Sequence, residues 1–207
     1  MSALDDVLKG LNKTYGKPVI SQADKIIYPK LTRLSTGSLA IDLELGGGVP
    51  FGKVTMIVAN ESAGKTTLAI NMIVEAQKLG KRVVFIDVEG TFDKDWAETI
   101  GVDLSKLHIA IPDVGEQAVD ILDAVVQSNE AGLVILDSIA ALMPAAELNK
   151  PMIDVDSKGE YESSPEQIGD RALMLNRAVR KLTSALNKIN EEGERNQTAV
   201  VLINQFR

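Results

Sequence analysis

The stretch VTMIVANESAGKTTLAINMIVEAQKLG, residues 54–80, decides the fold class because it combines an apolar strand, a loop and a helix in direct succession. Residues 54–59 are apolar and β-rich, and residues 66–80 form a helical pattern that Gly80 ends. Further apolar strands are expected at 82–87, 107–111, 133–137 and 198–205, with helices near 115–128 and 170–190. Continuously apolar strands that alternate with helices predict an α/β fold, with a mostly parallel, twisted sheet covered by helices on both faces. In such sheets, ligands bind at the carboxyl ends of the strands.

The composition is that of one ordinary globular domain, with 207 residues of which 45% are hydrophobic and 25% charged. No window reaches the roughly 18 apolar residues of a membrane helix, and acids stand where a signal peptide needs basic residues. We therefore expect a soluble, cytoplasmic protein without membrane contact. The absence of cysteine excludes disulfides, thiol catalysis and Cys-based zinc sites, and a lone His108 leaves little material for a His-based metal site. Any metal should therefore be bound by oxygen. With a net charge of −7, any contact with nucleic acid needs a local basic patch.

The loop after the first strand matches the phosphate-binding pattern G-x-x-x-x-G-K-[ST], with Ala59 at the first glycine position. The expected nucleotide-binding residues here are Ala59, Asn60, Glu61, Ser62, Ala63, Gly64, Lys65, Thr66 and Thr67. Backbone N–H groups of such a loop surround a phosphate chain, Lys65 reaches the β- and γ-oxygens of ATP, and Thr66 binds Mg²⁺. The flanking strand and helix favour this interpretation over an ordinary turn with a solvated lysine. We expect Ala59 to have a negative φ, because a left-handed conformation would cost its methyl group about 1–2 kcal/mol.

Polar residues at the ends of three other strands predict the rest of the site. Asp137 ends a buried strand and would hold the water shell of Mg²⁺. Many ATPases place a catalytic Glu directly after that Asp, but here the position is Ser138, so the carboxylate must come from another strand. Glu89 is the candidate general base, and Asp87 or Gln205 is next in line for this role. The alternative is that Glu89 is only a solvated loop glutamate. Gln205 ends the last strand, where its amide would detect a γ-phosphate or merely cap a turn.

Seven stretches resemble the bacterial RecA recombinases and their phage-borne relatives, in order along nearly the whole chain. They are STGSLAIDLELGGGVPFGK (35–53), NESAGKTTL (60–68), FIDVEGTFDKDWAETIGVD (85–103), DVGEQA (113–118), LVILDSIAALMPAAEL (133–148), NRAVRKL (176–182) and INQFR (203–207). The resemblance implies a DNA-dependent ATPase that forms helical filaments on single-stranded DNA. Such proteins pair that strand with homologous duplex DNA in recombination, DNA repair and the SOS response to DNA damage.

The resemblance also implies roles for individual residues. Glu89 falls on the catalytic glutamate of the family, Asp137 on its magnesium-site aspartate and Gln205 on its γ-phosphate sensor. Asp93 and Trp96 fall on the pair that holds adenine, where the acid accepts from the exocyclic amine and the aromatic ring stacks on the base. Without the resemblance, helical spacing would favour Trp96 as a core residue.

Two neighbouring segments carry opposite charge near the implied DNA site. Residues 143–168 resemble the first DNA-binding loop of the family, yet six acids against two lysines give this segment a net charge of −4, which disfavours phosphate. Residues 171–188 form a helical pattern with five basic residues and no acid. Its expected apolar face comprises Leu175, Ala178, Val179, Leu182 and Leu186. The expected DNA-binding residues are Asn176, Arg177, Arg180 and Lys181, of which Asn176 and Arg180 match family contact positions. A merely solvated basic face is the alternative.

The N-terminal segment is expected to serve self-association. Residues 4–15 form a short amphipathic helix that must dock either on its own core or on a neighbouring subunit, and the resemblance favours the neighbour. The expected intersubunit residues are Leu4, Val7, Leu8, Leu11, Val19 and Ile20. We thus divide the chain into a polymerisation segment, 1–34, and an ATPase core, 35–207. The family continues beyond the position of Arg207 into a second DNA-binding loop, further core strands and a C-terminal domain, so we expect a truncated core.

Three functions remain open at this point. A recombinase is favoured over a hexameric, helicase-like ring ATPase by residues 89–96 and by NRAVRKL. A non-catalytic, truncated filament-assembly protein is the third possibility.

Overall fold

Residues 1–31 and residues 32–207 form two separate units of the computed structural model. The structure describes residues 3–16, 20–25, 31–148, 154–155, 161–162, 166–188 and 195–206. Among the described helices, none combines the length and the apolar character that crossing a membrane requires.

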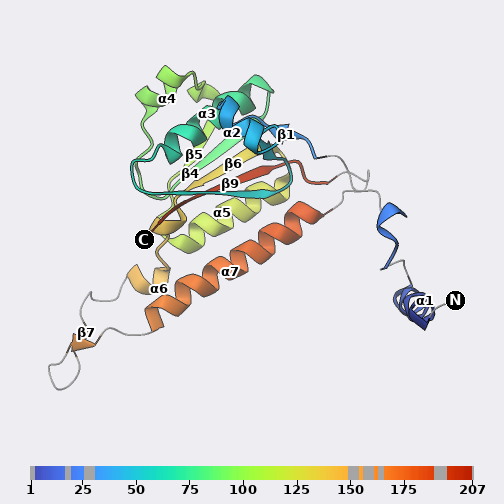
Figure 1. The fold of residues 1–207 in the computed structure, drawn as a ribbon. Coiled ribbons are helices and arrows are strands. Elements are labelled where there is room, and N and C mark those ends of the chain that lie inside the picture. The colour runs from blue at the N-terminus through green and yellow to red at the C-terminus, as the bar shows by residue number, and fades with distance from the viewer. Residues whose placement is uncertain are drawn as a thin grey trace. The chain divides into compact units, whose positions relative to one another are not determined.

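The larger unit is built on a five-stranded parallel sheet with the strand order β3-β9-β6-β4-β5 (Figure 1). Its strands are β3 (Val54–Ala59), β4 (Arg82–Asp87), β5 (Leu107–Ala110), β6 (Ala131–Asp137) and β9 (Ala199–Gln205). Central strand β6 is buried along its whole length, as a strand covered on both faces should be. The register pairs Ala59 with Gln205 and Asp87 with Asp137, so these strand ends lie at one edge of the sheet. The predicted α/β fold is confirmed.

Helices cover both faces of this sheet and create two cores. The helices of this unit are α2 (Leu39–Glu44), α3 (Lys65–Lys78), α4 (Lys94–Ile100), α5 (Gly115–Ser128), α6 (Ala145–Leu148) and α7 (Glu166–Asn187), with short 3-10 helices at Leu104–Lys106 (η2) and Ile139–Ala141 (η3). Helices α3 and α4 enclose one core around Phe85 and Ile135. Helices α5 and α7 enclose the other around Leu136 and Leu202. The alternation of strand side chains thus divides the apolar residues between two layers of helices.

Two small antiparallel pairs accompany the main sheet. Strand β1 (Arg33–Leu34) pairs with β2 (Val49–Pro50), and β7 (Asp154–Val155) pairs with β8 (Tyr161–Glu162). Gly48 has a φ of 106°, and a Cβ there would collide with the carbonyl oxygen of Leu34. A glycine is therefore required where the chain turns back toward β1.

Two expectations about the C-terminal helix are wrong in detail. Helix α7 begins at Glu166 rather than near residue 170. Parts of the preceding segment, 143–168, form α6, β7 and β8. Val179, expected on the apolar face, is 48% exposed. It follows buried Ala178 by one residue, which turns it about 100° away from the face that packs against α5. The remaining residues of that segment, 149–153, 156–160 and 163–165, lie outside the described part of the chain.

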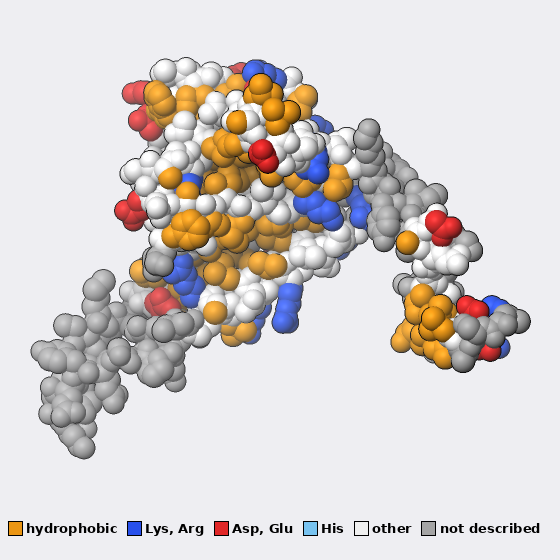
Figure 2. Space-filling view, in the orientation of Figure 1, with side chains coloured by type: hydrophobic (Ala, Val, Ile, Leu, Met, Phe, Trp, Pro, Cys, Tyr) orange, Lys and Arg blue, Asp and Glu red, His pale blue; other side chains and the backbone are white. Residues whose placement is uncertain are grey.

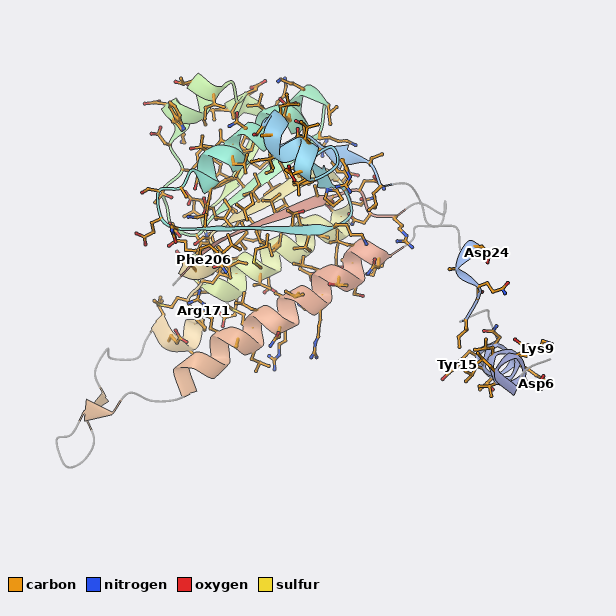
Figure 3. All side chains as sticks on the ribbon, in the orientation of Figure 1. Asp6, Lys9, Tyr15, Asp24, Arg171 and Phe206 are labelled. Carbon is orange, nitrogen blue, oxygen red and sulfur yellow. The ribbon has the colours of Figure 1, made fainter. Side chains whose placement is uncertain are left out.

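The smaller unit contains helix α1 (Ala3–Tyr15) and a short 3-10 helix, η1 (Ala23–Lys25). The Asn12 amide donates to the carbonyl oxygen of Ile20 at 2.9 Å and accepts from its N–H at 3.0 Å, which ties the following chain to α1. Leu4 and Val7 are exposed within this unit, as is Tyr15 (Figure 3). The expected intersubunit residue Val19 lies outside the described residues.

Candidate nucleotide-binding site

Strand β3 and helix α3 hold the two ends of the phosphate-loop motif, with residues 60–64 between them. Ser62, with a φ of 55°, and Gly64, with a φ of 85°, adopt the left-handed conformation that curves the loop. Ala59 ends β3 and is not among the described residues with positive φ. The expectation that its φ is negative is therefore confirmed, and its methyl group causes no backbone strain.

Lys65 is the first residue of α3, and the residue is only 9% exposed. Its Nζ donates to the carbonyl oxygen of Asn60 at 2.7 Å, which holds the ammonium group against the loop. An ammonium group has three donors, so it can exchange this carbonyl for phosphate oxygens. The N-terminus of α3 adds partial positive charge at the same place.

Thr66 and Asp137 place two hydrogen-bonded side-chain oxygens beside the loop. Thr66 Oγ1 donates to Asp137 Oδ2 at 2.6 Å, and Asp137 is only 4% exposed. Burial raises the pKa of Asp137; the Thr66 hydrogen bond and Lys65 oppose this, whereas the nearby carboxylates of Glu89 and Asp87 reinforce it. A cation here would offset the cost of the buried charge. Hard oxygen donors next to a phosphate loop fit Mg²⁺, which Thr66 and Asp137 would hold together with phosphate and water oxygens.

Glu89 lies directly beyond the carboxyl end of β4, two residues after Asp87. Its Oε1 accepts a hydrogen bond from Ser138 Oγ at 2.5 Å and a long one from Gln205 Nε2 at 3.4 Å. Asp87 differs, because its two oxygens accept the backbone N–H groups of residues 90, 91 and 92. Asp87 therefore shapes the loop after β4, and the structure disfavours it as the alternative base.

These side chains surround one pocket of about 460 Å³ at the carboxyl edge of the sheet. It is lined by Glu61, Ser62, Gly64, Lys65, Thr66, Thr67, Glu89, Asp137 and Gln205. The strands thus bring together residues that lie up to 144 positions apart in the chain, between Glu61 and Gln205.

The residues expected to hold adenine, Asp93 and Trp96, do not line this pocket and lie at the start of α4. Asp93 Oδ1 accepts the Trp96 backbone N–H at 2.9 Å and so caps the helix. Trp96 is 47% exposed, which excludes the alternative that it fills the core.

The basic residues expected to bind DNA lie on α7, on the opposite helix layer from α3. Asn176, Arg177, Arg180 and Lys181 are all exposed. Figure 2 shows Lys and Arg side chains on the surface over α7, next to apolar side chains. Lys181 Nζ lies 3.9 Å from Asp120 Oδ1 and 3.8 Å from Asp123 Oδ2, both on α5. Among the described residues, Arg180 has no ion pair, so it is the less constrained cation.

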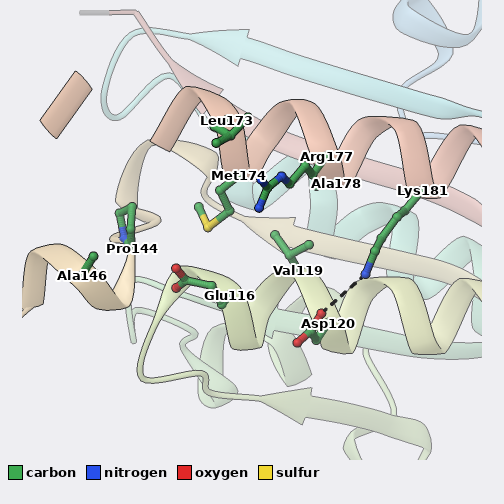
Figure 4. Close-up of a pocket in the computed structure, with 10 residues that line it drawn as sticks. All are labelled: Glu116, Val119, Asp120, Pro144, Ala146, Leu173, Met174, Arg177, Ala178 and Lys181. Atoms are coloured by element: carbon green, nitrogen blue, oxygen red, sulfur yellow. Dashed lines mark ion pairs between the residues drawn. The ribbon is translucent and has the colours of Figure 1, made fainter. Parts of the chain in front are cut away.

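A second pocket, of about 480 Å³, lies between α5, α7 and residues 144–146 (Figure 4). It mixes apolar residues such as Met174 with Arg177 and Lys181 on α7, and with Glu116 and Asp120 on α5. Opposite charges therefore face each other across it, and two of the four expected DNA-binding residues border it.

Sequence reasoning missed the role of Arg171 (Figure 3). Its Nη2 donates to the carbonyl oxygens of Ile139 and Ala140 at 2.6 and 2.7 Å, which joins the start of α7 to η3. The helical pattern groups Arg171 with the other basic residues, and nothing in the sequence separates it from them. It also missed the contact of Ser138 with Glu89, which depends on the pairing of β4 with β6.

Comparison with known proteins gives one consistent result along nearly the whole chain. Residues 2–207 match the family described as the RecA N-terminal domain. The chain is 40% identical over 206 residues to Protein RecA of Rubrobacter xylanophilus, which covers 99% of this chain and 55% of that protein. It is 39% identical over 206 residues to Protein RecA of Solidesulfovibrio magneticus and 38% to that of Aquifex aeolicus, covering 53% and 54% of those proteins. The chain spans about half the length of the curated relatives it matches.

Proposed function

Because the chain belongs to the RecA N-terminal domain family, we propose that it is the ATPase part of a cytoplasmic DNA recombinase. In this proposal it binds Mg²⁺–ATP, assembles on single-stranded DNA and promotes pairing with homologous duplex DNA. The relatives named RecA support the recombination and repair role, and the site geometry supports the ATPase role.

One observation carries the ATPase proposal: a phosphate loop, a magnesium-site pair and a carboxylate line a single pocket. Lys65 would neutralise charge on the β- and γ-phosphates, and Thr66 and Asp137 would hold Mg²⁺, which supplies charge neutralisation when bound. Glu89 would accept a proton from water as the water oxygen attacks the γ-phosphorus and the bond to the β-phosphate oxygen breaks. Gln205 would donate its amide hydrogen bond to the γ-phosphate.

The DNA part of the proposal is carried by α7. Arg177 and Arg180 present exposed guanidinium groups on a helix whose described residues from 171 to 188 include no acid. Such groups bind phosphate by releasing counterions locally, which a net charge of −7 does not prevent. The apolar face of α1 would contribute by docking on a neighbouring subunit.

Electron microscopy of the chain with single-stranded DNA and a non-hydrolysable ATP analogue tests this function. Open helical filaments are the expected result, and Lys65→Ala should reduce them because it removes the phosphate contact. Closed rings would instead support a helicase-like ATPase. Isolated monomers that still bind the analogue would support a non-catalytic assembly protein and contradict the recombinase proposal for this chain.

A further inference from the structure

We propose that Ser138 is a positioning residue that holds the Glu89 carboxylate ready for the attacking water. This inference rests on the ATPase function proposed above and adds a residue to its machinery. Its basis is the hydrogen bond of 2.5 Å from Ser138 Oγ to Glu89 Oε1. Hydrogen bonds to an ionised carboxylate are about twice as strong as those between neutral groups.

The backbone around Ser138 is held in place from several sides. Ser138 is completely buried and directly follows the last residue of central strand β6. The Val88 N–H donates to the Asp137 carbonyl oxygen at 2.8 Å, which extends the β4–β6 pairing to the residue before Glu89. The Ala141 N–H donates to the Ser138 carbonyl oxygen at 3.2 Å. A donor fixed in this way can restrain a flexible glutamate more effectively than an exposed group can.

The two oxygens of the Glu89 carboxylate have different surroundings. Oε1 accepts the bond from Ser138 and the longer contact from Gln205. The described residues offer Oε2 no donor, and Glu89 lines the pocket. Ser138 therefore orients the carboxylate through one oxygen and leaves the other able to accept a proton from water. When the Gln205 amide turns to a γ-phosphate, the Ser138 bond is the one that keeps this orientation.

Two consecutive residues thus connect the metal site with the base. Asp137 contacts Thr66 at the loop, and Ser138 contacts Glu89. Many ATPases carry the catalytic Glu at the position that Ser138 occupies here. In this chain the Ser138 hydroxyl would instead align Glu89, which follows the neighbouring strand β4. The competing explanation is that Glu89 only provides a hydrogen-bond acceptor for the buried Ser138 hydroxyl. Loss of that hydrogen bond would then change only the free energy of unfolding.

Calorimetry with two ligands separates these explanations, using the 207-residue chain itself. Mg²⁺–ADP reports ordinary nucleotide binding, and Mg²⁺–ADP with aluminium fluoride mimics the transition state, including the attacking water. Ser138→Ala should leave ADP affinity unchanged and reduce the preference for the transition-state mimic about tenfold, since one charge-assisted hydrogen bond is lost. Thr198→Val is the matched control, because the Thr198 hydroxyl is equally buried and bonds Ala131 O at the opposite end of the sheet.

A double-mutant cycle with Glu89→Gln completes the test. If Ser138 acts through Glu89, Ser138→Ala should have little further effect on that preference once Glu89 is replaced. Equal preference in Ser138→Ala and wild type, no preference in the wild type, or full additivity with Glu89→Gln would each overturn the inference. Failure of the wild type to bind Mg²⁺–ADP at all would instead contradict the proposed ATPase function, so the two failures are distinguishable.

Discussion

The candidate nucleotide pocket around Lys65 and the basic face of α7 around Arg180 differ in how their polar side chains are held. In the pocket, Thr66 at the start of α3 bonds to Asp137 at the end of β6, and Glu89 in the loop after β4 bonds to Ser138. On α7, Arg177 and Arg180 extend from an exposed helix face and have no ion pair within the described part of the chain. The pocket therefore depends on fixed geometry, whereas the helix face depends on charge.

Substitutions in the pocket should therefore have larger effects than substitutions on α7. Under the proposed ATPase function, a change in the pocket would alter a defined contact to reacting atoms, and transition-state contacts change rates by orders of magnitude. A change on α7 removes one of several screened charges, whose contributions are small and nearly additive.

The largest effect is expected from Glu89→Gln, which keeps the shape of the side chain and removes its basicity. Turnover of ATP should fall about 100-fold or more, the usual scale for a general base, while nucleotide affinity stays constant. Steady-state hydrolysis with single-stranded DNA, together with calorimetry, measures both quantities. Unchanged turnover would show that the pocket carboxylate does not act on water.

Lys65→Ala should weaken ATP binding by about tenfold or more, because it removes a buried ammonium group that would contact two phosphates. Lys78→Ala is the control, since Lys78 lies at the other end of α3 and forms its ion pair with Glu75 on the same helix. Calorimetry compares the two variants. Equal ATP affinities of the two variants would show that the loop of residues 60–64 and Lys65 do not form the binding site.

Asp137→Asn tests how much the buried carboxylate charge of Asp137 lowers the free energy of unfolding. The pKa of Asp137 is raised by burial, so the folded state binds its proton more tightly than the unfolded state does. Its contribution to the free energy of unfolding therefore declines as pH rises from the ordinary Asp range through the raised pKa. Without Mg²⁺ at neutral pH, Asp137→Asn should be more stable by about 1 kcal/mol.

Urea unfolding at pH 4 and pH 7 measures this effect, and the gain should be smaller at the lower pH. Added Mg²⁺–ATP should stabilise the wild type more than Asp137→Asn. If Asp137→Asn is less stable than the wild type at both pH values, the burial of the Asp137 charge does not destabilise the folded protein. That result would contradict its assignment as a metal-site carboxylate.

The smallest effects are expected on α7, and they should differ between adjacent cations. Arg180→Ala should lower the slope of log affinity for single-stranded DNA against log salt by about 0.7, the loss of one phosphate contact. Lys181→Ala should change this slope less, because Asp120 and Asp123 already share its charge. It should instead lower the free energy of unfolding by less than about 1 kcal/mol.

Fluorescence anisotropy across a salt series and urea unfolding give the two readouts. Identical slopes for Arg180→Ala and the wild type would reduce α7 to a solvated face. A larger slope change in Lys181→Ala than in Arg180→Ala would show that its ion pairs do not restrain it.

The fold and the pocket were largely predictable because apolar runs identify buried strands and the parallel arrangement gathers their carboxyl ends at one edge. That reasoning places Lys65, Asp137, Glu89 and Gln205 around one pocket, as the structure does. Family resemblance added Asp93 and Trp96, which lie outside that pocket and whose role stays a prediction.

The remaining features depend on three-dimensional packing that a one-dimensional pattern does not contain. The contact of Ser138 with Glu89 requires the register of β4 against β6, and the pairing of Lys181 requires the position of α5 beside α7. Val179 was misplaced because a helix pattern defines the edge of an apolar face only within about one residue. Strands β1 and β2, with two residues each, are too short to show any period.

A crystal structure of the chain with Mg²⁺ and a non-hydrolysable ATP analogue tests the central claim most directly. We expect triphosphate in the loop of residues 60–64, with Lys65 Nζ moved from the Asn60 carbonyl oxygen to the β- and γ-phosphates. We also expect Mg²⁺ between Thr66 and the phosphates, and a Gln205 amide directed at the γ-phosphate. Nucleotide bound elsewhere, with Lys65 still bonded to Asn60 and Thr66 to Asp137, would contradict that claim.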